Sequence, residues 1–217
     1  MNVFRLAADM IHLASIFILL FKLTKSKNCV GISCRMQEMY AIVFCLRYVD
    51  LLYQFVSVYN SAMKVIFLIS TFYLIYLMRY KAPICQTYDA NADNFPYEKF
   101  LLPPAAILGF LTAELWTIPE IMWSTSIWLE AVTIVPQLML LQAQREIENL
   151  TSDYVFAMGT YRALYIVNWV FRYFMEGYVN WVGWVGGIIQ TGLYVDFFYY
   201  YAMSKWYGQK LVLPIAA

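Results

Sequence analysis

The chain has 217 residues, of which 62% are hydrophobic and 13% are charged, and its formal net charge is +1. Soluble domains carry about a quarter charged residues, so this composition excludes an ordinary soluble domain. The near-neutral charge and the lack of a long basic tract argue against a nucleic-acid partner. Apolar runs of about 20 residues recur along the chain, which predicts a polytopic, all-α membrane protein.

These runs predict seven membrane-spanning helices. Their expected ranges are 3–22, 37–57, 62–80, 100–114, 118–140, 151–172 and 179–203. The first run contains Arg5 and Asp9 and has no small-residue cleavage site, so we interpret it as a retained span rather than a signal peptide. The fourth is short and contains Pro103 and Pro104, which predicts an irregular or broken helix. We expect one transmembrane domain over 1–217, with a short tail at about 204–217.

The second and sixth spans show a weak internal repeat. Each has an aromatic residue and a buried arginine near its middle, followed by a polar residue about a turn later. With three spans before the fourth and three after it, this pattern predicts a 3+1+3 pseudo-repeat, as in the parallel repeats of sugar-transporter folds.

Lysine and arginine fall mainly in the connections at one end of these spans. This set comprises Lys22, Lys25, Lys27, Arg35, Arg79, Lys81, Lys99, Arg145, Lys205 and Lys210. The opposite connections contain little besides Lys64. The positive-inside rule makes the basic end cytosolic, and an odd number of spans then predicts a lumenal N-terminus and a cytosolic C-terminus. The longest connection, 81–99, is polar and of mixed charge, so we interpret it as a solvated loop.

The sixth span carries polar residues within a helix of membrane length. At about 100° per residue, Arg162, Tyr165, Trp169 and Arg172 fall on one stripe, with the two arginines about 15 Å apart along the axis. Charged residues at bilayer depth nearly always face an interior cavity, so this stripe is a candidate functional site. The alternative is a set of ion pairs that only specifies helix packing.

The direction of each span places the other buried polar residues by depth. The residues expected at middle depth are His12, Arg47, Glu130 and Arg162. Those expected above them are Arg5, Glu120 and Arg172, with the tryptophans. This arrangement predicts a cavity that is open to the lumen and closed toward the cytosol. Arginine keeps its charge when buried and binds carboxylates with a two-pronged fork, so the cavity favours anions. An extended tetrapeptide spans about 13 Å, which suits the spacing of the two arginines in the sixth span.

His12 is the only histidine, and the predicted depth makes it a candidate pH switch; a packing role is the alternative.

The chain has no Ser-His-Asp order, HExxH or P-loop, and Asp50 and Asp196 lack the GxGD context of intramembrane aspartyl proteases. These absences argue against an enzyme. Asp89 and Asp93 lack the glycine and terminal glutamate of a calcium loop, and we expect neither metal nor cofactor.

Several stretches together resemble one known family along nearly the whole chain. They are MNVFRLAADMIHLAS, RYVDL, YNSAMKVIFL, PEIMW, WLEAVTIVPQL, YRALYIVNWVFRYFMEG and QTGLYVDFFYYY. They resemble the KDEL receptors, also called ER lumen protein retaining receptors, and Pro136–Gln137 also fits the related PQ-loop and SWEET-like proteins with their 3+1+3 fold. The resemblance implies a sorting receptor that binds C-terminal KDEL- or HDEL-like signals of escaped ER proteins in the acidic Golgi and releases them in the neutral ER. It also implies cycling between ER and Golgi membranes, contact with membrane lipid and recruitment of coat proteins (coatomer) at the cytosolic face.

The resemblance implies a role for each site residue. The terminal carboxylate of the peptide would contact Arg47, Tyr48 and Arg162. The glutamate side chain of the signal would contact Arg5, and its aspartate side chain would contact Arg172. Its first, basic residue would lie among Asp50, Glu120, Trp123 and Trp169, while Tyr165 and Asn168 line the pocket. His12, Glu130 and Tyr161 would form the proton-sensitive network, and Lys205 and Lys210 would serve cytosolic sorting.

The bound peptide is anionic, so protonation of His12 is expected to favour binding, and affinity should fall as the pH rises through the histidine titration. Gln54, Glu114 and Asn180 depart from the family pattern and leave the preference at the first signal position open. A PQ-loop or SWEET-type transporter of a small solute is the alternative function. A third possible function is that of an adaptor protein whose buried polar residues serve only helix packing.

Overall fold

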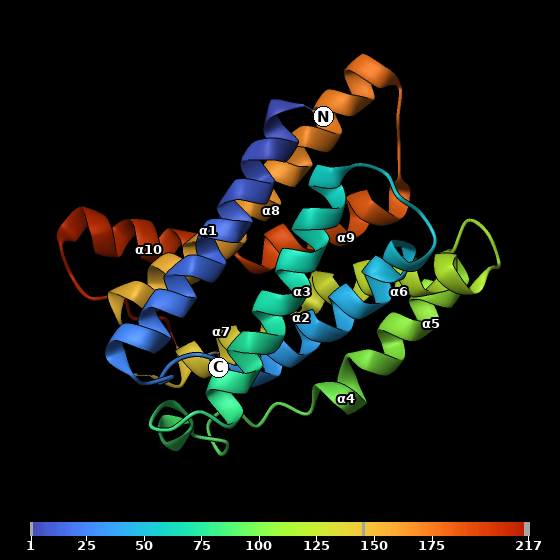
Figure 1. Ribbon diagram of the computed structural model, residues 1–217. Coiled ribbons are helices and arrows are strands. Elements are labelled where there is room, and N and C mark those ends of the chain that lie inside the picture. Colours follow the sequence, from blue (N-terminus) through green and yellow to red (C-terminus); the bar gives the residue numbers. More distant parts are fainter. Residues whose placement is uncertain (1, 145, 215–217) are drawn as a thin grey trace.

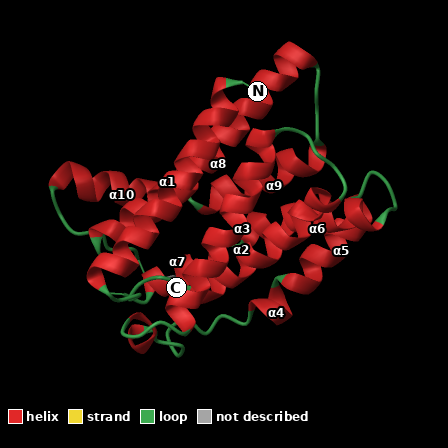
Figure 2. Ribbon diagram, viewed as in Figure 1, coloured by secondary structure: helices red, strands yellow, loops and turns green. Residues whose placement is uncertain are grey.

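The computed structural model describes residues 2–144 and 146–214, which form an all-α protein as predicted. The α-helices are α1 (Val3–Ser26), α2 (Cys34–Arg47), α3 (Val58–Arg79), α4 (Tyr97–Phe100), α5 (Leu102–Thr112), α6 (Ile118–Val132), α7 (Val135–Gln142), α8 (Asn149–Glu176), α9 (Trp181–Leu193) and α10 (Val195–Tyr207). Two 3-10 helices, η1 (Tyr48–Leu52) and η2 (Ile84–Thr87), lie between them. Loops join the helices throughout the described chain (Figure 2). Arg145 of the predicted basic end and residues 215–217 of the predicted tail lie outside the described residues.

Within the part of the chain that the structure describes, three helical stretches are long and apolar enough to cross a membrane. They are Val3–Ser26, Val58–Arg79 and Ile118–Gln142, which correspond to the first, third and fifth predicted spans. A bilayer core about 30 Å thick needs about 20 residues of helix, and each of these stretches meets that length. The chain is therefore an all-α protein with several candidate membrane spans.

The helices pack around one apolar core, and the longest two, α1 and α8, lie side by side along much of their length (Figure 1). Helix α2 packs against α3 and α6, and α6 also contacts α5 and α9. Buried side chains that join these helices include Leu19, Leu23, Phe44, Leu129 and Tyr161. This arrangement leaves α1, α3, α6, α8 and α9 around a common space, which the end of α2 and η1 enter.

Side-chain caps fix where four of these helices begin. Asn2, Ser33, Ser57 and Asn180 each precede a helix and accept a hydrogen bond from a backbone N–H in its first turn. Such caps satisfy donors that the first turn of a helix leaves unpaired. At its other end α8 stops at Gly177, whose φ of 63° is readily adopted by glycine. The predicted second span, 37–57, stops being helical at Leu52, and an extended segment then leads to Ser57.

The predicted fourth span, 100–114, is interrupted at Leu101, between α4 and α5. Helix α5 covers Leu102–Thr112, with Pro103 and Pro104 in its first turn. Proline is tolerated there because the N–H groups of the first turn have no partner within the helix. The helix that contains the two prolines is therefore regular, the break lies just before it at Leu101, and the short length is confirmed.

The fifth and seventh predicted spans are each divided. Helix α6 ends at Val132 and α7 begins at Val135, directly before Pro136, which cannot donate to the preceding turn. Predicting one continuous helix over 179–203 is wrong, because the chain bends at Tyr194 between α9 and α10. In Figure 1, α9 and α10 lie on opposite sides of the α1–α8 pair. The ring of Tyr194 is fully buried beside Gly159 of α8, where a Cβ would lie 2.7 Å from it. This close approach favours the bend.

Lys22 is not the solvated loop charge that its sequence position suggests. Its side chain is fully buried near the end of α1. The ammonium group donates to the carbonyl of Val30 at 2.6 Å and to Thr151, and it lies 3.1 Å from the Glu148 carboxylate. A buried lysine needs such partners, and these three tie α1 to the following loop and to the start of α8.

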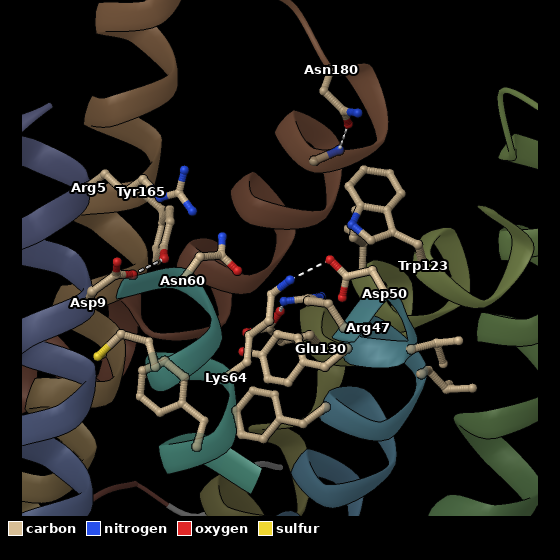
Figure 3. Close-up of a pocket in the computed structure, with 18 of the residues that line it drawn as sticks. Arg5, Asp9, Arg47, Asp50, Asn60, Lys64, Trp123, Glu130, Tyr165 and Asn180 are labelled. Atoms are coloured by element: carbon tan, nitrogen blue, oxygen red, sulfur yellow. Dashed lines mark hydrogen bonds and ion pairs between the residues drawn. The ribbon is translucent and has the colours of Figure 1, made fainter. Parts of the chain in front are cut away.

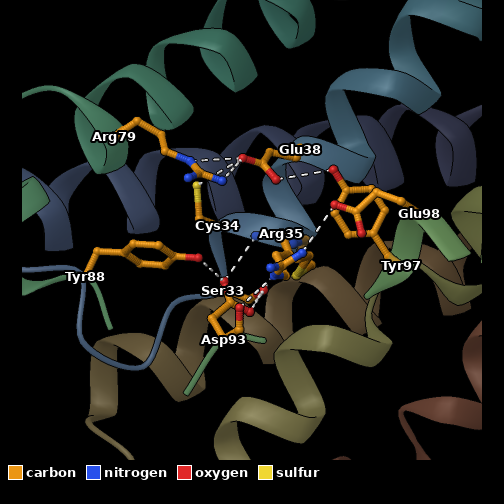
Figure 4. Close-up of polar contacts among 10 residues, drawn as sticks. Ser33, Cys34, Arg35, Glu38, Arg79, Tyr88, Asp93, Tyr97 and Glu98 are labelled. Carbon is orange, nitrogen blue, oxygen red and sulfur yellow. Dashed lines mark hydrogen bonds and ion pairs between the residues drawn. The ribbon is translucent and has the colours of Figure 1, made fainter. Parts of the chain in front are cut away.

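The 81–99 connection is anchored rather than simply solvated. Asp93 is 2% exposed, and its carboxylate accepts hydrogen bonds from Ser33 Oγ at 2.7 Å, Arg35 N at 3.2 Å and Tyr88 Oη at 2.8 Å (Figure 4). It therefore supplies negative charge at the N-terminus of α2, where the helix dipole favours an anion. Burial, reinforced by the hydrogen bond to Asp93, raises the pKa of the Tyr88 phenol above its usual range, so this phenol remains a donor at neutral pH.

Candidate functional site

A polar cavity of about 630 Å³ lies between the helices (Figure 3). It has the size of a small-molecule or short-peptide site. Its lining includes every residue predicted for peptide binding and proton sensing: Arg5, His12, Arg47, Tyr48, Asp50, Glu120, Trp123, Glu130, Tyr161, Arg162, Tyr165, Asn168, Trp169 and Arg172. These residues come from α1, α2, η1, α6 and α8, and α3 and α9 complete the lining, although the residues are far apart in the sequence.

The floor of the cavity is a carboxylate shared by two guanidinium groups. Glu130 on α6 is 2% exposed, and its Oε2 atom lies 2.6 Å from Arg162 Nη2 and also accepts from Arg47 Nη1. Its other oxygen, Oε1, accepts from Tyr161 Oη at 3.0 Å. Two positive charges and one negative charge leave the floor with a net positive charge, which favours an anion.

The guanidinium of Arg47 is only partly satisfied. Its Nε atom donates to Ser126 Oγ at 3.1 Å, and Nη1 is paired with Glu130. Its Nη2 atom is buried and has no hydrogen-bond partner among the described residues. Buried polar atoms are nearly always paired, so this unpaired donor marks a place for an acceptor from a ligand or water. Arg162 differs, since its Nε atom donates to Gln190 of α9.

His12 is held in a stack of aromatic rings next to this floor. Its ring centroid is 4.2 Å from that of Tyr161, with the planes 8° apart, and 4.5 Å from that of Phe67. The side chain is largely buried in α1. Tyr161 donates to Glu130, which pairs with both arginines. A proton on His12 would therefore add a positive charge that is separated from these arginines only by the ring of Tyr161 and the carboxylate of Glu130.

A buried polar layer closes the cavity beneath His12. Tyr40 Oη lies 3.3 Å from Tyr161 Oη, and Gln37 Nε2 donates to Tyr154 Oη at 2.8 Å. These four side chains are at most 3% exposed. The cavity therefore ends at the depth of His12.

Near the mouth, α1 and α8 contribute a second polar group. Asp9 accepts hydrogen bonds from Tyr59 Oη at 2.9 Å and from Tyr165 Oη, and Asn168 accepts from Asn2 Nδ2 at 2.7 Å. Arg5, one turn before Asp9, makes no side-chain hydrogen bond or ion pair with the part of the chain that the structure describes. Its guanidinium is thus available to an anionic group in the cavity.

Lys64 is a cavity residue that sequence reasoning did not single out. It reaches from α3 to the carboxylate of Asp50 on η1 and forms an ion pair with it (Figure 3). Its ammonium also lies 5.7 Å from the centre of the Tyr48 ring. The sequence did contain a feature that could have identified Lys64. It is nearly the sole basic residue at the predicted lumenal end of the spans, and it shares a helical face with the polar residue Asn60.

The opposite wall is built by α8 and α9. Arg172 lies 2.6 Å from Glu176 and 4.0 Å from the centre of the Tyr178 ring, so the guanidinium is oriented at the rim. Trp169 packs against Gly187, where a Cβ would lie 2.4 Å from the indole. Asn180 both lines the cavity and caps α9.

The two lysines predicted for cytosolic sorting lie outside this cavity. Lys205 is 3.1 Å from Asp153, and Lys210 pairs with Glu146. Next to Lys210, the backbone N–H of Ile147 donates to the carbonyl of Leu211 at 3.0 Å. Among residues 2–144 and 146–214, no group of three or more His, Cys, Asp or Glu side chains is placed to hold a metal ion.

The fold and the site define a class of protein: an all-α membrane protein with an arginine-rich cavity that suits an anionic ligand. A sequence model of the family described as ER lumen protein retaining receptor matches residues 28–172. The chain is 59% identical to an ER lumen protein-retaining receptor of Plasmodium falciparum over 216 residues, which cover 99% of this chain and 98% of the relative. It is 49% identical to receptor B of Arabidopsis thaliana and 47% identical to receptor 2 of Gallus gallus, with at least 99% of each chain covered.

The chain therefore belongs to the ER lumen protein-retaining receptor family, a family of ER and Golgi membrane proteins. This membership confirms the resemblance seen in the sequence. It also confirms the predicted function class, a sorting receptor rather than an enzyme.

Proposed function

We propose that the cavity binds the C-terminal four residues of KDEL- or HDEL-like signals on soluble ER proteins. The volume of about 630 Å³ fits a short peptide. Arg162 and Arg172 are ten positions apart on one helix, about 15 Å along its axis, and an extended tetrapeptide spans about 13 Å. The terminal carboxylate contacts Arg47, Tyr48 and Arg162 at the floor, and the acidic side chains contact Arg5 and Arg172 nearer the mouth.

One observation carries this proposal. The floor holds two arginines but only one carboxylate, and Arg47 keeps a buried donor atom without a partner among the described residues. A free C-terminal carboxylate supplies two acceptor atoms and the missing negative charge. Ion pairs formed only for packing would leave no such donor, because unpaired buried groups are destabilising.

The same residues support binding at acidic pH and release at neutral pH. His12 lies against Tyr161, which donates to Glu130, and Glu130 pairs with both arginines of the floor. Protonation of His12 adds positive charge beside the carboxylate of the peptide and therefore strengthens binding. Loss of that proton in the neutral ER weakens it.

The proposal includes a membrane topology for one domain. Helices α1, α2 with η1, and α3 form three spans, α5 forms the fourth, and α6–α7, α8 and α9–α10 form the last three, in the 3+1+3 order of the SWEET and PQ-loop folds. The cavity then opens to the lumen, the outer helix faces contact lipid, and the C-terminus is cytosolic. Lys205 and Lys210 lie at the cytosolic end, where coatomer would bind.

The test is direct binding of a free-carboxylate KDEL or HDEL peptide to the purified receptor, beside the same peptide as a C-terminal amide. We expect strong binding of the carboxylate form at about pH 5.5, weak binding at about pH 7.2, and weak binding of the amide at both. Equal binding of the two forms, or binding of neither at acidic pH, would overturn the proposal. Flux of a sugar or amino acid through receptor-containing vesicles would instead favour the transporter.

A further inference from the structure

The ion pair between Lys64 and Asp50 occupies part of the cavity that a peptide must enter. Lys64 projects from the first turns of α3 and Asp50 from η1, and both side chains line the cavity. The two side chains are 14% and 25% exposed, so the pair is partly shielded from water. Ion pairs in such surroundings interact more strongly than those on an open surface.

Only half of the Asp50 carboxylate is used by this pair. Its Oδ2 atom contacts Lys64, whereas Oδ1 is buried and has no hydrogen-bond partner among the described residues. The carboxylate can thus accept a second cation or exchange the first. A lysine side chain from a peptide has the same ammonium group as Lys64, so the two would compete for one acceptor.

We propose that Lys64 is a specificity residue, an internal competitor that occupies Asp50 until a ligand with a basic first residue displaces it. This inference rests on the proposed function and names a residue of the same site. In the free receptor Lys64 neutralises Asp50. A peptide whose first residue is lysine takes over the carboxylate and displaces the Lys64 ammonium toward the ring of Tyr48.

The position of Lys64 supports this exchange. Its ammonium lies near both Asp50 and the ring of Tyr48, the residue next to Arg47 on the floor. Rotation about the four-carbon lysine side chain moves the charge between these two neighbours without moving the helix. A peptide with a neutral first residue offers no replacement cation, so Lys64 remains on Asp50 and no ion pair is exchanged when such a peptide binds.

The test measures the affinities of free-carboxylate KDEL and ADEL peptides at about pH 5.5. In Lys64→Met a peptide lysine no longer has to displace an internal cation from Asp50, so KDEL should gain affinity while ADEL, which has no such lysine, changes little. We expect the KDEL-to-ADEL affinity ratio to rise about tenfold, which lies within the coupling expected of charged groups in contact. Lys64→Arg should keep the wild-type ratio, and Asp50→Asn should bring the ratio close to one.

Two controls separate this inference from folding and from the proposed function. Val65→Met introduces the same side chain at the next position of α3, where the residue is 43% exposed, and should leave the ratio unchanged. The Asp50→Asn, Lys64→Met double variant has no unpaired charge at this place and should show the low ratio of Asp50→Asn in a folded protein.

An unchanged or lower ratio in Lys64→Met would overturn the inference, as would an unchanged ratio in Asp50→Asn. Both results leave the proposed function intact if the wild-type receptor still prefers the free carboxylate over the amide. If the wild-type receptor shows no such preference, the proposed function fails, and the inference fails with it.

Discussion

Arg162 Nη2 lies 2.6 Å from Glu130 Oε2, and the same oxygen accepts from Arg47. One carboxylate on α6 thus holds two guanidinium groups from α2 and α8 at a fixed separation. A second negative group can enter only where these two cations leave a donor unpaired. The ligand-free cavity is therefore already arranged for a carboxylate at its floor.

Replacing Arg162 with lysine should abolish peptide binding in a protein that still folds. Lysine keeps the charge opposite Glu130 but cannot form the two-pronged contact or donate to Gln190 from a second nitrogen. We expect a loss of about 2–5 kcal/mol in binding free energy, measured by calorimetry with a free-carboxylate peptide. Arg79→Lys is the matched control, since Arg79 pairs with Glu38 at the exposed far end of α3. A variant that only lowers thermal stability and binds normally would support the adaptor reading.

His12 should account for the pH dependence of binding. In wild type, affinity is expected to rise as the pH falls through the histidine titration, because the protonated ring adds a positive charge near an anionic ligand. In His12→Ala the ratio of affinities at about pH 5.5 and pH 7.2 should approach one. Alanine also leaves a cavity between Tyr161 and Phe67, so His12→Phe, which fills the space without titrating, serves as a second variant. Persistence of the pH dependence in both variants would place the switch elsewhere.

Gly187 should be essential for the shape of the cavity wall. A Cβ at this position would lie 2.4 Å from the Trp169 ring, closer than packed atoms can approach. Gly187→Ala should therefore displace the indole, lower the melting temperature and weaken peptide binding, by about 1–3 kcal/mol in stability. Gly192→Ala in the same helix is the control, because no atom lies within 4 Å of its Cβ position. Equal effects of the two variants would show that loss of a helical glycine, rather than the contact with Trp169, is responsible.

Asp93 should stabilise the fold from the end opposite the cavity. Asp93→Ala leaves Ser33, Tyr88 and the backbone N–H of Arg35 without their acceptor, at a cost of about 1–3 kcal/mol in unfolding free energy. Asp89→Ala removes only contacts to Asn91 and Ala92 within the same loop and should have a smaller effect. Thermal unfolding compares the two variants. Peptide affinity, measured well below the melting temperature, should stay near the wild-type value in both.

The sequence predicted the contents of the cavity better than the path of the helices. Helical periodicity placed Arg162 and Arg172 on one stripe, and span direction brought His12, Arg47 and Glu130 to one depth, because both depend only on rise and rotation per residue. The bend at Tyr194 was missed because it depends on a ring packing against Gly159 of another helix. The residues around Tyr194 in the sequence do not show which side chain of another helix will pack against it.

Charged residues were harder to place than apolar ones. Lys22 and Lys64 were counted with the connections between spans, and Asp93 was placed in a solvated loop, yet each is held by partners at least eight positions away or from another element. Hydropathy identifies a charge as costly to bury but does not show which partner offsets that cost. The Lys64–Asp50 pair in particular requires the turn of η1, which the prediction of a continuous second span did not contain.

The buried layer of Tyr40, Gln37 and Tyr154 beneath His12 makes the cavity a dead end. In the proposed orientation a peptide enters with its last residue first and has no exit beyond the floor. The same four residues in the middle of a polypeptide could not be accommodated, since the chain that follows them would have nowhere to go. The position of a retrieval signal at the extreme end of its cargo is thus a requirement set by the depth of the receptor.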